Sequence, residues 1–256
     1  MKLDNAVIVG FGVVGKATAK ALGIKNFFDL KKSNISLQDA SKKNYIFICL
    51  PTPTINGRCF IGNIDKTIKK ISKHKGGNSV VIIRSTITPG TTRKLSKKYQ
   101  IPIIHHPEFL TESTAYEDSK KPDLLVFGCD DNKVMNKFTQ IYKDFSCPKF
   151  KMDSISSEIL KYAVNNFYAT KVIFANQIYD LCQKFGVNYD LLEKAMYSRK
   201  WIGKNHLDVW HKGYRGAGGN CLPKDLQAFV SFSKLPLLKQ VLEINRSLLS
   251  KVEKIK

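Results

Sequence analysis

Six short apolar runs, each separated from the next by a stretch of helical character, divide the first 150 residues. They are AVIVG, NFFDL, YIFICL, SVVIIRS, IPIIHH and DLLVFG. Strands that are apolar along nearly their whole length are typical of a parallel sheet covered by helices on both faces. The chain is therefore expected to begin with a doubly wound α/β domain.

The pattern changes after Asp153. Residues 155–186 keep helical periodicity without an internal Gly or Pro, and Gly186 is expected to end this helix. Further helices are expected at 188–199, 223–232 and 236–255, with an irregular loop at 203–220. We therefore predict an α/β domain over residues 1–153 and an all-helical domain over residues 154–256.

The net charge of +21 could indicate a nucleic-acid-binding surface, because phosphate binding is driven by cationic charge. Only six of the 42 basic residues are arginine, however, and lysine pairs recur along the whole chain. Solvated lysine faces explain this spread better than a nucleic-acid surface, and attraction for an anionic small molecule is a third explanation. We do not expect a nucleic-acid partner.

The chain has no apolar run long enough to span a membrane, and its N-terminus lacks the pattern of a secretory signal. Its six cysteines show no CxxC spacing and no cluster with histidine. Neither a metal site nor a disulfide framework is therefore indicated. We expect a protein of the reducing cytoplasm that does not contact a membrane.

The first apolar run leads directly into GFGVVG, residues 10–15, and a helical segment follows. The glycines let the backbone turn tightly and approach a pyrophosphate, whose charge the N–H groups of the helix start would face. Asp29 lies at the end of the second predicted strand, where a ribose 2′-OH would be held, and an acid there favours NAD over NADP. The alternative is an ordinary strand-to-helix turn.

The segment GYRGAGGNCLPKD, residues 213–225, places Cys221 just before a proline. Proline favours the first turn of a helix, so we expect Cys221 at or beside a helix N-cap, where the free amides stabilise a thiolate. Asp225 would follow one turn later on the same face. The alternative is a cysteine that is buried as a small apolar side chain.

These residues belong to a series of motifs that resembles the UDP-glucose/GDP-mannose dehydrogenase family of nucleotide-sugar dehydrogenases. GAGGNCLPKD is similar to the family's GxGGxCLPKD signature. The other matching segments, in chain order, are CLPTPT at 49–54, RSTITPGTT at 84–92, HPEFLTESTAYEDSKKPDLLVFG at 106–128, SSEILKYAVNNFYATKVIFANQI at 156–178 and SRKWIGKNH at 198–206. The resemblance covers most of the chain and implies a Rossmann-type NAD-binding domain followed by a central dimerisation domain.

The resemblance implies that a sugar C6 alcohol is oxidised to a carboxylate in two NAD-dependent steps. Cys221 would capture the intermediate aldehyde, and Asp225 would transfer protons with a water. Lys161 and Asn165, which lie on one helix face, would stabilise the oxyanion. Glu112 would assist thioester hydrolysis, and Thr86 would order the catalytic water. The family implies a role in nucleotide-sugar metabolism and polysaccharide biosynthesis.

The remaining site residues also follow from the resemblance. The expected NAD-binding residues are Gly10, Gly12, Val13, Val14, Gly15, Asp29, Lys31, Pro51, Thr52 and Thr86. The expected substrate-binding residues are Glu108, Phe109, Leu110, Lys161, Asn165 and Gly218. Glu158 is left open between an exposed helix salt bridge and a site role. His105 and His106 are expected to be structural.

The sequence departs from the family pattern in two main respects. The connection between the second and third predicted strands is short, and we expect the family's C-terminal nucleotide-sugar domain to be lacking after KQVLEINRSLLSKVEKIK. This last helix is expected to expose its apolar positions Leu238, Val241, Leu242, Ile244, Leu248 and Leu249 unless another chain covers them. We expect a homodimer, and a second polypeptide could supply the missing domain. The alternative to an enzyme is a catalytically impaired NAD-binding protein that holds an anionic partner.

Overall fold

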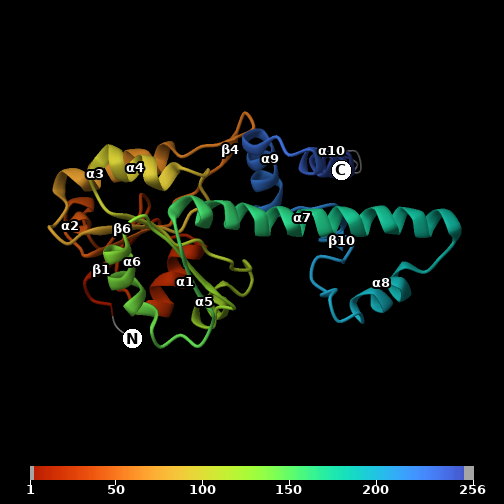
Figure 1. The fold of residues 1–256 in the computed structure, drawn as a ribbon, viewed down its shortest axis with the longest axis horizontal. Helices are drawn as coiled ribbons and strands as arrows, with labels where there is room; N and C mark the ends of the chain where they lie inside the picture. Colours follow the sequence, from red (N-terminus) through yellow and green to blue (C-terminus); the bar gives the residue numbers. More distant parts are fainter. Residues whose placement is uncertain (1–2, 251–256) are drawn as a thin grey trace. The chain divides into compact units, whose positions relative to one another are not determined.

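A computed structural model describes residues 3–250 and divides them into two compact units. The first unit comprises residues up to Pro53 and Cys59–Lys161. The second comprises Thr54–Arg58 and the residues from Tyr162 onward. The ribbon in Figure 1 follows the chain through both units.

A seven-stranded sheet forms the centre of the first unit, with the strand order β2-β1-β3-β6-β7-β8-β9. Its strands are β1 (Ala6–Val9), β2 (Asn26–Phe28), β3 (Tyr45–Ile48), β6 (Val80–Ile83), β7 (Ile103–His105), β8 (Leu125–Gly128) and β9 (Lys149–Met152). The six predicted strands are confirmed, and β9 is an additional edge strand. The parallel prediction is wrong for one pair, because β7 and β8 are antiparallel where His105 faces Gly128.

Helices cover both faces of this sheet (Figure 1). One face is covered by α1 (Val13–Leu22), α5 (Ala115–Lys120), α6 (Asn132–Thr139) and the 3₁₀ turn η1 (Gln140–Tyr142). The other is covered by α2 (Leu37–Ser41), α3 (Gly62–His74) and α4 (Thr91–Tyr99). Alternate strand residues separate two cores, since Ile8 and Phe47 pack toward the first face and Val7 and Ile46 toward the second.

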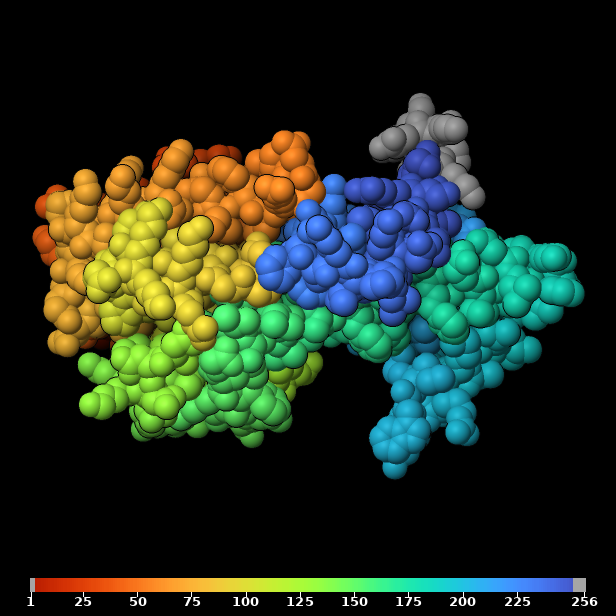
Figure 2. Space-filling model, turned by 45° about the horizontal axis from the view of Figure 1, so that its top comes forward, coloured from red at the N-terminus to blue at the C-terminus, as the bar shows by residue number. Residues whose placement is uncertain are grey.

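Figures 1 and 2 show α3 and α4 side by side. Lys98 of α4 forms an ion pair of 2.9 Å with Asp65 of α3. The apolar face of α3, with Ile64, Ile68 and Ile71, is fully buried because these residues recur at the spacing of one helical face. The lysines of α3 therefore lie toward solvent, as expected from the distribution of lysine along the whole chain.

The second unit is built along α7 (Ser154–Phe185), whose residues up to Lys161 belong to the first unit. Gly186 follows with a φ of +65°, which confirms it as the helix stop. The remaining elements are α8 (Tyr189–Tyr197), the hairpin of β10 (Trp210–His211) and β11 (Tyr214–Arg215), α9 (Leu222–Ser233) and α10 (Pro236–Ser250). A second small hairpin, β4 (Thr54–Ile55) and β5 (Arg58–Cys59), turns at Asn56-Gly57.

The apolar face of α10 is covered by the chain itself. Val241, Leu242 and Leu248 are buried in one core with Ala169 and Leu226, and Leu238 and Ile244 pack against it. The expectation that α10 exposes these positions is therefore wrong, because α7 and α9 supply the missing apolar surface. Residues 251–255 of the predicted helix lie outside the described residues.

Membrane-spanning helices and metal clusters are both absent from the described residues. Even the longest helix, α7 with 32 residues, lacks an apolar stretch that could cross a membrane. No group of three or more His, Cys, Asp and Glu side chains within residues 3–250 is placed to hold a metal ion.

Candidate active site

The glycines of the β1–α1 turn divide into two kinds. Gly10 has a φ of +94°, and a Cβ there would lie 2.6 Å from the carbonyl oxygen of Cys49. A Cβ at Gly15 would lie 2.1 Å from the carbonyl oxygen of Gly10, so packing requires glycine at both positions. At Gly12, by contrast, no described atom would lie within 4 Å of a Cβ. The turn therefore leaves open space at Gly12, as a bound pyrophosphate would need.

The helix that follows has an open N-terminus. Gly12 is the N-cap of α1 and no side chain caps the first turn, which also contains no acidic residue. Val13 and Val14 form this turn, so their amides face the space at Gly12. An anion is favoured at such a helix start. The geometry fits the diphosphate of a dinucleotide.

Asp29 connects the end of β2 to this turn. Its carboxylate accepts a hydrogen bond of 2.8 Å from the N–H of Phe11 and one of 3.1 Å from the N–H of Lys31. These two bonds, led by that of Phe11, hold the pKa of Asp29 below its usual value. Asp29 is therefore an anion beside the turn, where the sequence predicts a contact with ribose.

The ends of β3 and β6 are joined by a side-chain bond. Thr52 Oγ1 donates a hydrogen bond of 2.8 Å to the carbonyl oxygen of Thr86, and both residues are buried. Pro51 is exposed beside Thr52. Ligands of doubly wound sheets bind at the carboxyl ends of the strands, where all three residues lie.

Lys161 and Glu108 form a buried ion pair within the first unit. Lys161 Nζ lies 2.6 Å from the carbonyl oxygen of Glu108 and 3.3 Å from its Oε1, and it lies 5.1 Å from the ring centre of Phe109. The N–H of Leu110 donates a bond of 2.7 Å to Glu108 Oε2. Burial would raise the pKa of Glu108, but Lys161, the Leu110 amide and Arg84 outweigh it and leave the pKa lowered. The Glu108 carboxylate is thus ionised.

Glu112 differs from the Lys161–Glu108 pair in its exposure to solvent. It is exposed in the segment that precedes α5. Both it and Glu108 come from the predicted PEFLTES motif, and Glu108 is the acid that forms the buried ion pair with Lys161.

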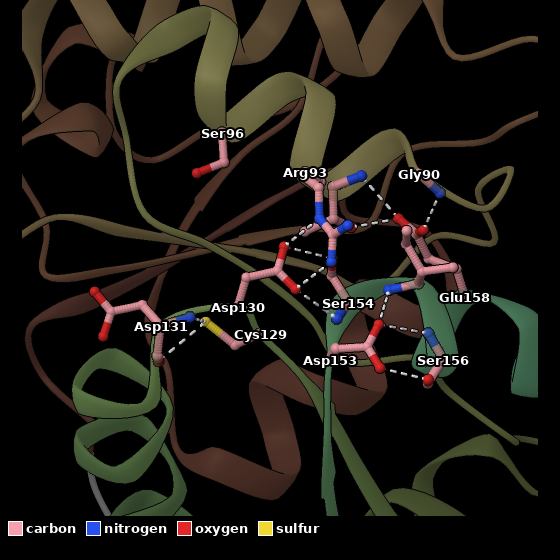
Figure 3. Close-up of polar contacts among 12 residues, drawn as sticks. Gly90, Arg93, Ser96, Cys129, Asp130, Asp131, Asp153, Ser154, Ser156 and Glu158 are labelled. Carbon is pink, nitrogen blue, oxygen red and sulfur yellow. Dashed lines mark hydrogen bonds and ion pairs between the residues drawn. The ribbon is translucent and has the colours of Figure 1, made fainter.

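Glu158 is fully buried, so the interpretation as an exposed salt bridge is wrong. Its carboxylate accepts hydrogen bonds from the N–H of Gly90 and from the N–H and hydroxyl of Thr92, at the N-terminus of α4 (Figure 3). Beside it, Arg93 and Ser154 both bond to Asp130. Glu158 therefore caps α4 and fixes the start of α7 against it.

His105 and His106 are buried and neutral. His105 Nδ1 lies 2.6 Å from Ser157 Oγ, and His106 Nδ1 lies 2.7 Å from the carbonyl oxygen of Val126. Burial lowers the pKa of His105 to about 3 and that of His106 well below its usual value. Neither ring could serve as a proton carrier near neutral pH, in agreement with a structural role.

The second unit brings together two of the predicted catalytic residues. Asn165 Nδ2 on α7 donates a hydrogen bond of 2.6 Å to Asp225 Oδ2 on α9, and both side chains are buried. Lys224 forms an ion pair with the other oxygen of Asp225. Lys161 lies four residues before Asn165 on the same continuous helix. The predicted spacing on one helix face is therefore preserved.

Cys221 is the N-cap of α9, and Pro223 lies in the first turn, as predicted. The thiol-bearing residue is exposed, which contradicts the alternative of a buried apolar cysteine. The N–H of Asp225 donates to the carbonyl oxygen of Cys221 at 3.0 Å, so the acid lies one turn from the cysteine. A Cβ at Gly218 would overlap the hydroxyl of Tyr214, at 2.1 Å. Glycine is therefore required there by packing.

Two residues near these sites were not predicted. Arg84 directly follows β6 and is buried, and its Nε has no hydrogen-bond partner among residues 3–250. Asn245 is buried on α10, where it pairs with Ala217. Each could have been found as a polar residue within an apolar pattern, since Arg84 follows VVII and Asn245 lies between Leu242 and Leu248.

Comparison with known proteins matches most of the chain to one family. The model of the NAD binding domain of the UDP-glucose/GDP-mannose dehydrogenase family matches residues 24–146, and that of the family's central domain matches residues 155–247. The first match begins after the Gly10–Gly15 turn described above.

Curated relatives and solved structures agree with this match. UDP-glucose 6-dehydrogenase YwqF of Bacillus subtilis is 33% identical over 221 residues, which are 81% of this chain and 49% of the relative. UDP-glucose 6-dehydrogenase of Rickettsia conorii is 33% identical over 206 residues, 78% of this chain and 47% of the relative. The structure of a UDP-glucose dehydrogenase from Pyrobaculum islandicum has a TM-score of 0.84 at 25% identity, over 94% of this chain and 68% of that one. The chain thus spans about half the length of the curated relatives it matches.

Proposed function

Because the chain belongs to the UDP-glucose/GDP-mannose dehydrogenase family and takes NAD as its cofactor, we propose that it oxidises the C6 alcohol of a nucleotide sugar to a carboxylate in two steps. UDP-glucose is the proposed substrate, since the matched relatives are named UDP-glucose 6-dehydrogenase. The chain spans only half of those relatives, so its activity by itself is part of this proposal.

One observation carries the proposal. Asn165 of α7 is hydrogen-bonded to Asp225 of α9, one turn beyond an exposed cysteine at the helix N-terminus. An amide donor, a buried acid and an exposed thiol are the groups that capture of an aldehyde and proton transfer require. These three residue types were assigned to that chemistry by their positions in the family motifs.

Hydride transfer is the chemistry that NAD supplies when bound, once in each oxidation. In the first step the C6 alcohol becomes an aldehyde, and a proton leaves its hydroxyl to a water held by Asp225. The Cys221 thiolate then adds to the aldehyde carbon, and the resulting alkoxide takes a proton to give a thiohemiacetal. Loss of hydride from that carbon, with loss of the hydroxyl proton, leaves a thioester on Cys221.

Hydrolysis of the thioester restores the thiol. Water adds to the thioester carbon, the C–S bond breaks, and the carboxylate leaves as Cys221 recovers a proton. Lys161 and Asn165 are proposed to donate to the oxygen that becomes negative in each addition. Glu112, which is exposed, is proposed to accept a proton from the attacking water, and Thr86 to order that water. Glu108, ionised beside Lys161, Phe109, Leu110 and Gly218 are proposed to contact the sugar.

NAD is proposed to bind along the carboxyl edge of the sheet. The amides of Val13 and Val14 and the open space at Gly12 would receive the diphosphate. Asp29 and Lys31 at the end of β2 would hold the adenosine ribose. Pro51, Thr52 and Thr86 are proposed to contact the nicotinamide half, and the strand order β2-β1-β3-β6 supports this because they follow β3 and β6.

The test is reduction of NAD by the purified chain with a panel of UDP- and GDP-sugars, followed by absorbance of the reduced nicotinamide. We expect turnover with UDP-glucose and its loss in Cys221→Ser. Cys147→Ser, outside the proposed site, serves as the matched control and should keep activity. If NAD binds but no sugar is oxidised, even with the separately expressed C-terminal half of a relative added, an NAD-binding protein without catalysis is the better account.

A homodimer is proposed through the surface of α7. Phe167, Phe174 and Leu181 are 62%, 53% and 51% exposed, and their spacing of seven residues places them along one side of the helix. An apolar stripe of this kind is expected to pack against a second copy. Because Cys221 must remain a thiol between turnovers, the reducing cytoplasm is the proposed location.

A further inference from the structure

The loop that carries the cysteine, residues 216–221 between β11 and α9, is held by contacts from α7, β11 and α10. At its start, Arg215 donates bonds of 2.9 and 3.0 Å to the side chain and carbonyl of Asn176 and forms an ion pair of 2.7 Å with Asp180. These contacts fix the direction in which the chain leaves the hairpin, and all lie in the second unit.

A single side chain then satisfies both backbone groups of Ala217. Asn245 Oδ1 accepts a bond of 2.7 Å from the N–H of Ala217, and Asn245 Nδ2 donates one of 3.0 Å to the carbonyl oxygen of Ala217. Asn245 and Ala217 are each 1% exposed. Water therefore cannot replace the carboxamide without rearrangement, and loss of Asn245 would leave two buried backbone groups unpaired.

The glycines around Ala217 fit closely to this arrangement. Gly216 has a φ of +96°, and a Cβ there would lie 2.9 Å from Asn245 Oδ1. On the other side, the N–H of Gly219 donates a bond of 3.0 Å to the hydroxyl of Tyr214. The loop is thus shaped around the carboxamide of Asn245 at one point and around Tyr214 at the next.

We propose that Asn245 is a positioning residue for Cys221, fixing the loop so that the sulfur stays at the N-terminus of α9. Only three residues separate Ala217 from Cys221, and on the other side Asp225 binds the Cys221 carbonyl at 3.0 Å. A displacement of Ala217 is therefore transmitted to the N-cap. The proposal deepens the proposed function and rests on it for the role of the thiol as nucleophile.

The consequence concerns thiol reactivity. The thiolate is the reactive form, and the amides of the first helical turn stabilise it only while the sulfur lies at the helix start. When the loop is released, the sulfur samples positions away from those amides. The effect is a property of the thiol itself, so it can be measured without a sugar substrate.

The experiment measures alkylation of Cys221 by iodoacetamide over a range of pH, with the Cys221 peptide quantified by mass spectrometry. We expect Asn245→Leu to move the pH profile to higher pH and to slow alkylation at neutral pH by about tenfold, as a tenfold smaller thiolate fraction would do. Tyr189→Phe is the matched control, because it removes a buried hydrogen bond of 2.9 Å to Leu207 in the same unit. It should lower thermal stability and leave the alkylation profile unchanged.

Gly216→Ala provides a second variant should Asn245→Leu fail to fold. Its added Cβ would displace the side-chain carboxamide of Asn245, and the substitution removes no polar group. We expect it to shift the profile in the same direction. A folded variant of either kind with the wild-type alkylation profile would overturn the proposal. Failure of the proposed function is a separate result. Even if the wild-type protein oxidises no sugar, the alkylation profiles of the variants can still be compared with that of wild type.

Discussion

Asn165 on α7 and Asp225 on α9 share a hydrogen bond of 2.6 Å between buried side chains. The bond gives Asp225 a neutral donor on one oxygen, while Lys224 lies at the other. The arrangement therefore depends on residue 165 being a donor.

Asn165→Asp is expected to make stability depend on pH. Two carboxylates at hydrogen-bond distance cannot both ionise, so one pKa of the pair rises. A raised folded pKa contributes stability below the unfolded pKa that is lost as pH rises through the folded value. A tenfold rise in the proton affinity of the folded pair lowers the stability at neutral pH by about 1.4 kcal/mol. Thermal unfolding against pH measures this.

Asn188→Asp is the control for that experiment, because Asn188 is an exposed N-cap of α8 that accepts from Leu191, and aspartate caps equally well. Its unfolding temperature should follow that of wild type above about pH 5, where an exposed aspartate is already ionised. Parallel curves for Asn165→Asp and wild type would contradict the predicted pairing.

Glu158→Gln is expected to destabilise the first unit by about 1–3 kcal/mol, since an amide nitrogen cannot accept from the donors at Gly90 and Thr92. Burial raises the pKa of Glu158 more than those bonds lower it. The wild type should therefore lose some stability as pH rises through this pKa, and the variant should lack that dependence. Urea unfolding with amide exchange of α4 measures both, with exposed Glu117→Gln as the unaffected control.

The sequence signals that succeeded are local ones. The strand runs, the stop at Gly186 and the N-cap at Cys221 are each encoded within a few neighbouring residues, so they could be predicted from spacing and residue type. The strand β9 was not predicted, because KFKM is mostly exposed and lacks the apolar run of a buried strand.

The contacts that were not predicted from the sequence join residues far apart in the chain. Glu158 bonds to Thr92 of α4, 66 residues earlier, and Asn245 pairs with the backbone of Ala217, 28 residues away. No local pattern identifies such a partner. The apolar side of α10 was predicted correctly as a pattern, but its cover by α7 and α9 depends on tertiary packing.

The proposed dimer predicts a sedimentation result. Wild-type protein at micromolar concentration should sediment as a dimer, and Phe174→Ser should shift it toward monomer, because Phe174 is at the middle of the exposed stripe on α7. Phe150→Ser is the matched control, since Phe150 is 49% exposed on β9 in the first unit. A monomeric wild type would contradict the dimer.

Arg84→Met is expected to raise the pKa of Glu108, because burial favours the neutral acid and Arg84 is one of the groups that oppose this. A lowered folded pKa gives stability above the unfolded pKa that is lost as pH falls through the folded value. With Arg84 removed, that loss should begin at higher pH. Acid unfolding followed by circular dichroism should show the shift, whereas Arg58→Met, in an exposed hairpin position, should match wild type.

The same experiment needs a second variant, because Arg84 also lowers the pKa of His105 and His106 alongside their burial. Removing Arg84 relieves that repulsion and favours the folded state in acid, which opposes the effect on Glu108. In a Glu108→Gln background only the effect on the two histidines remains. Arg84→Met should then move acid unfolding to lower pH or leave its pH unchanged. If Arg84→Met still moves acid unfolding to higher pH in the Glu108→Gln background, the effect does not come from the Glu108 carboxylate.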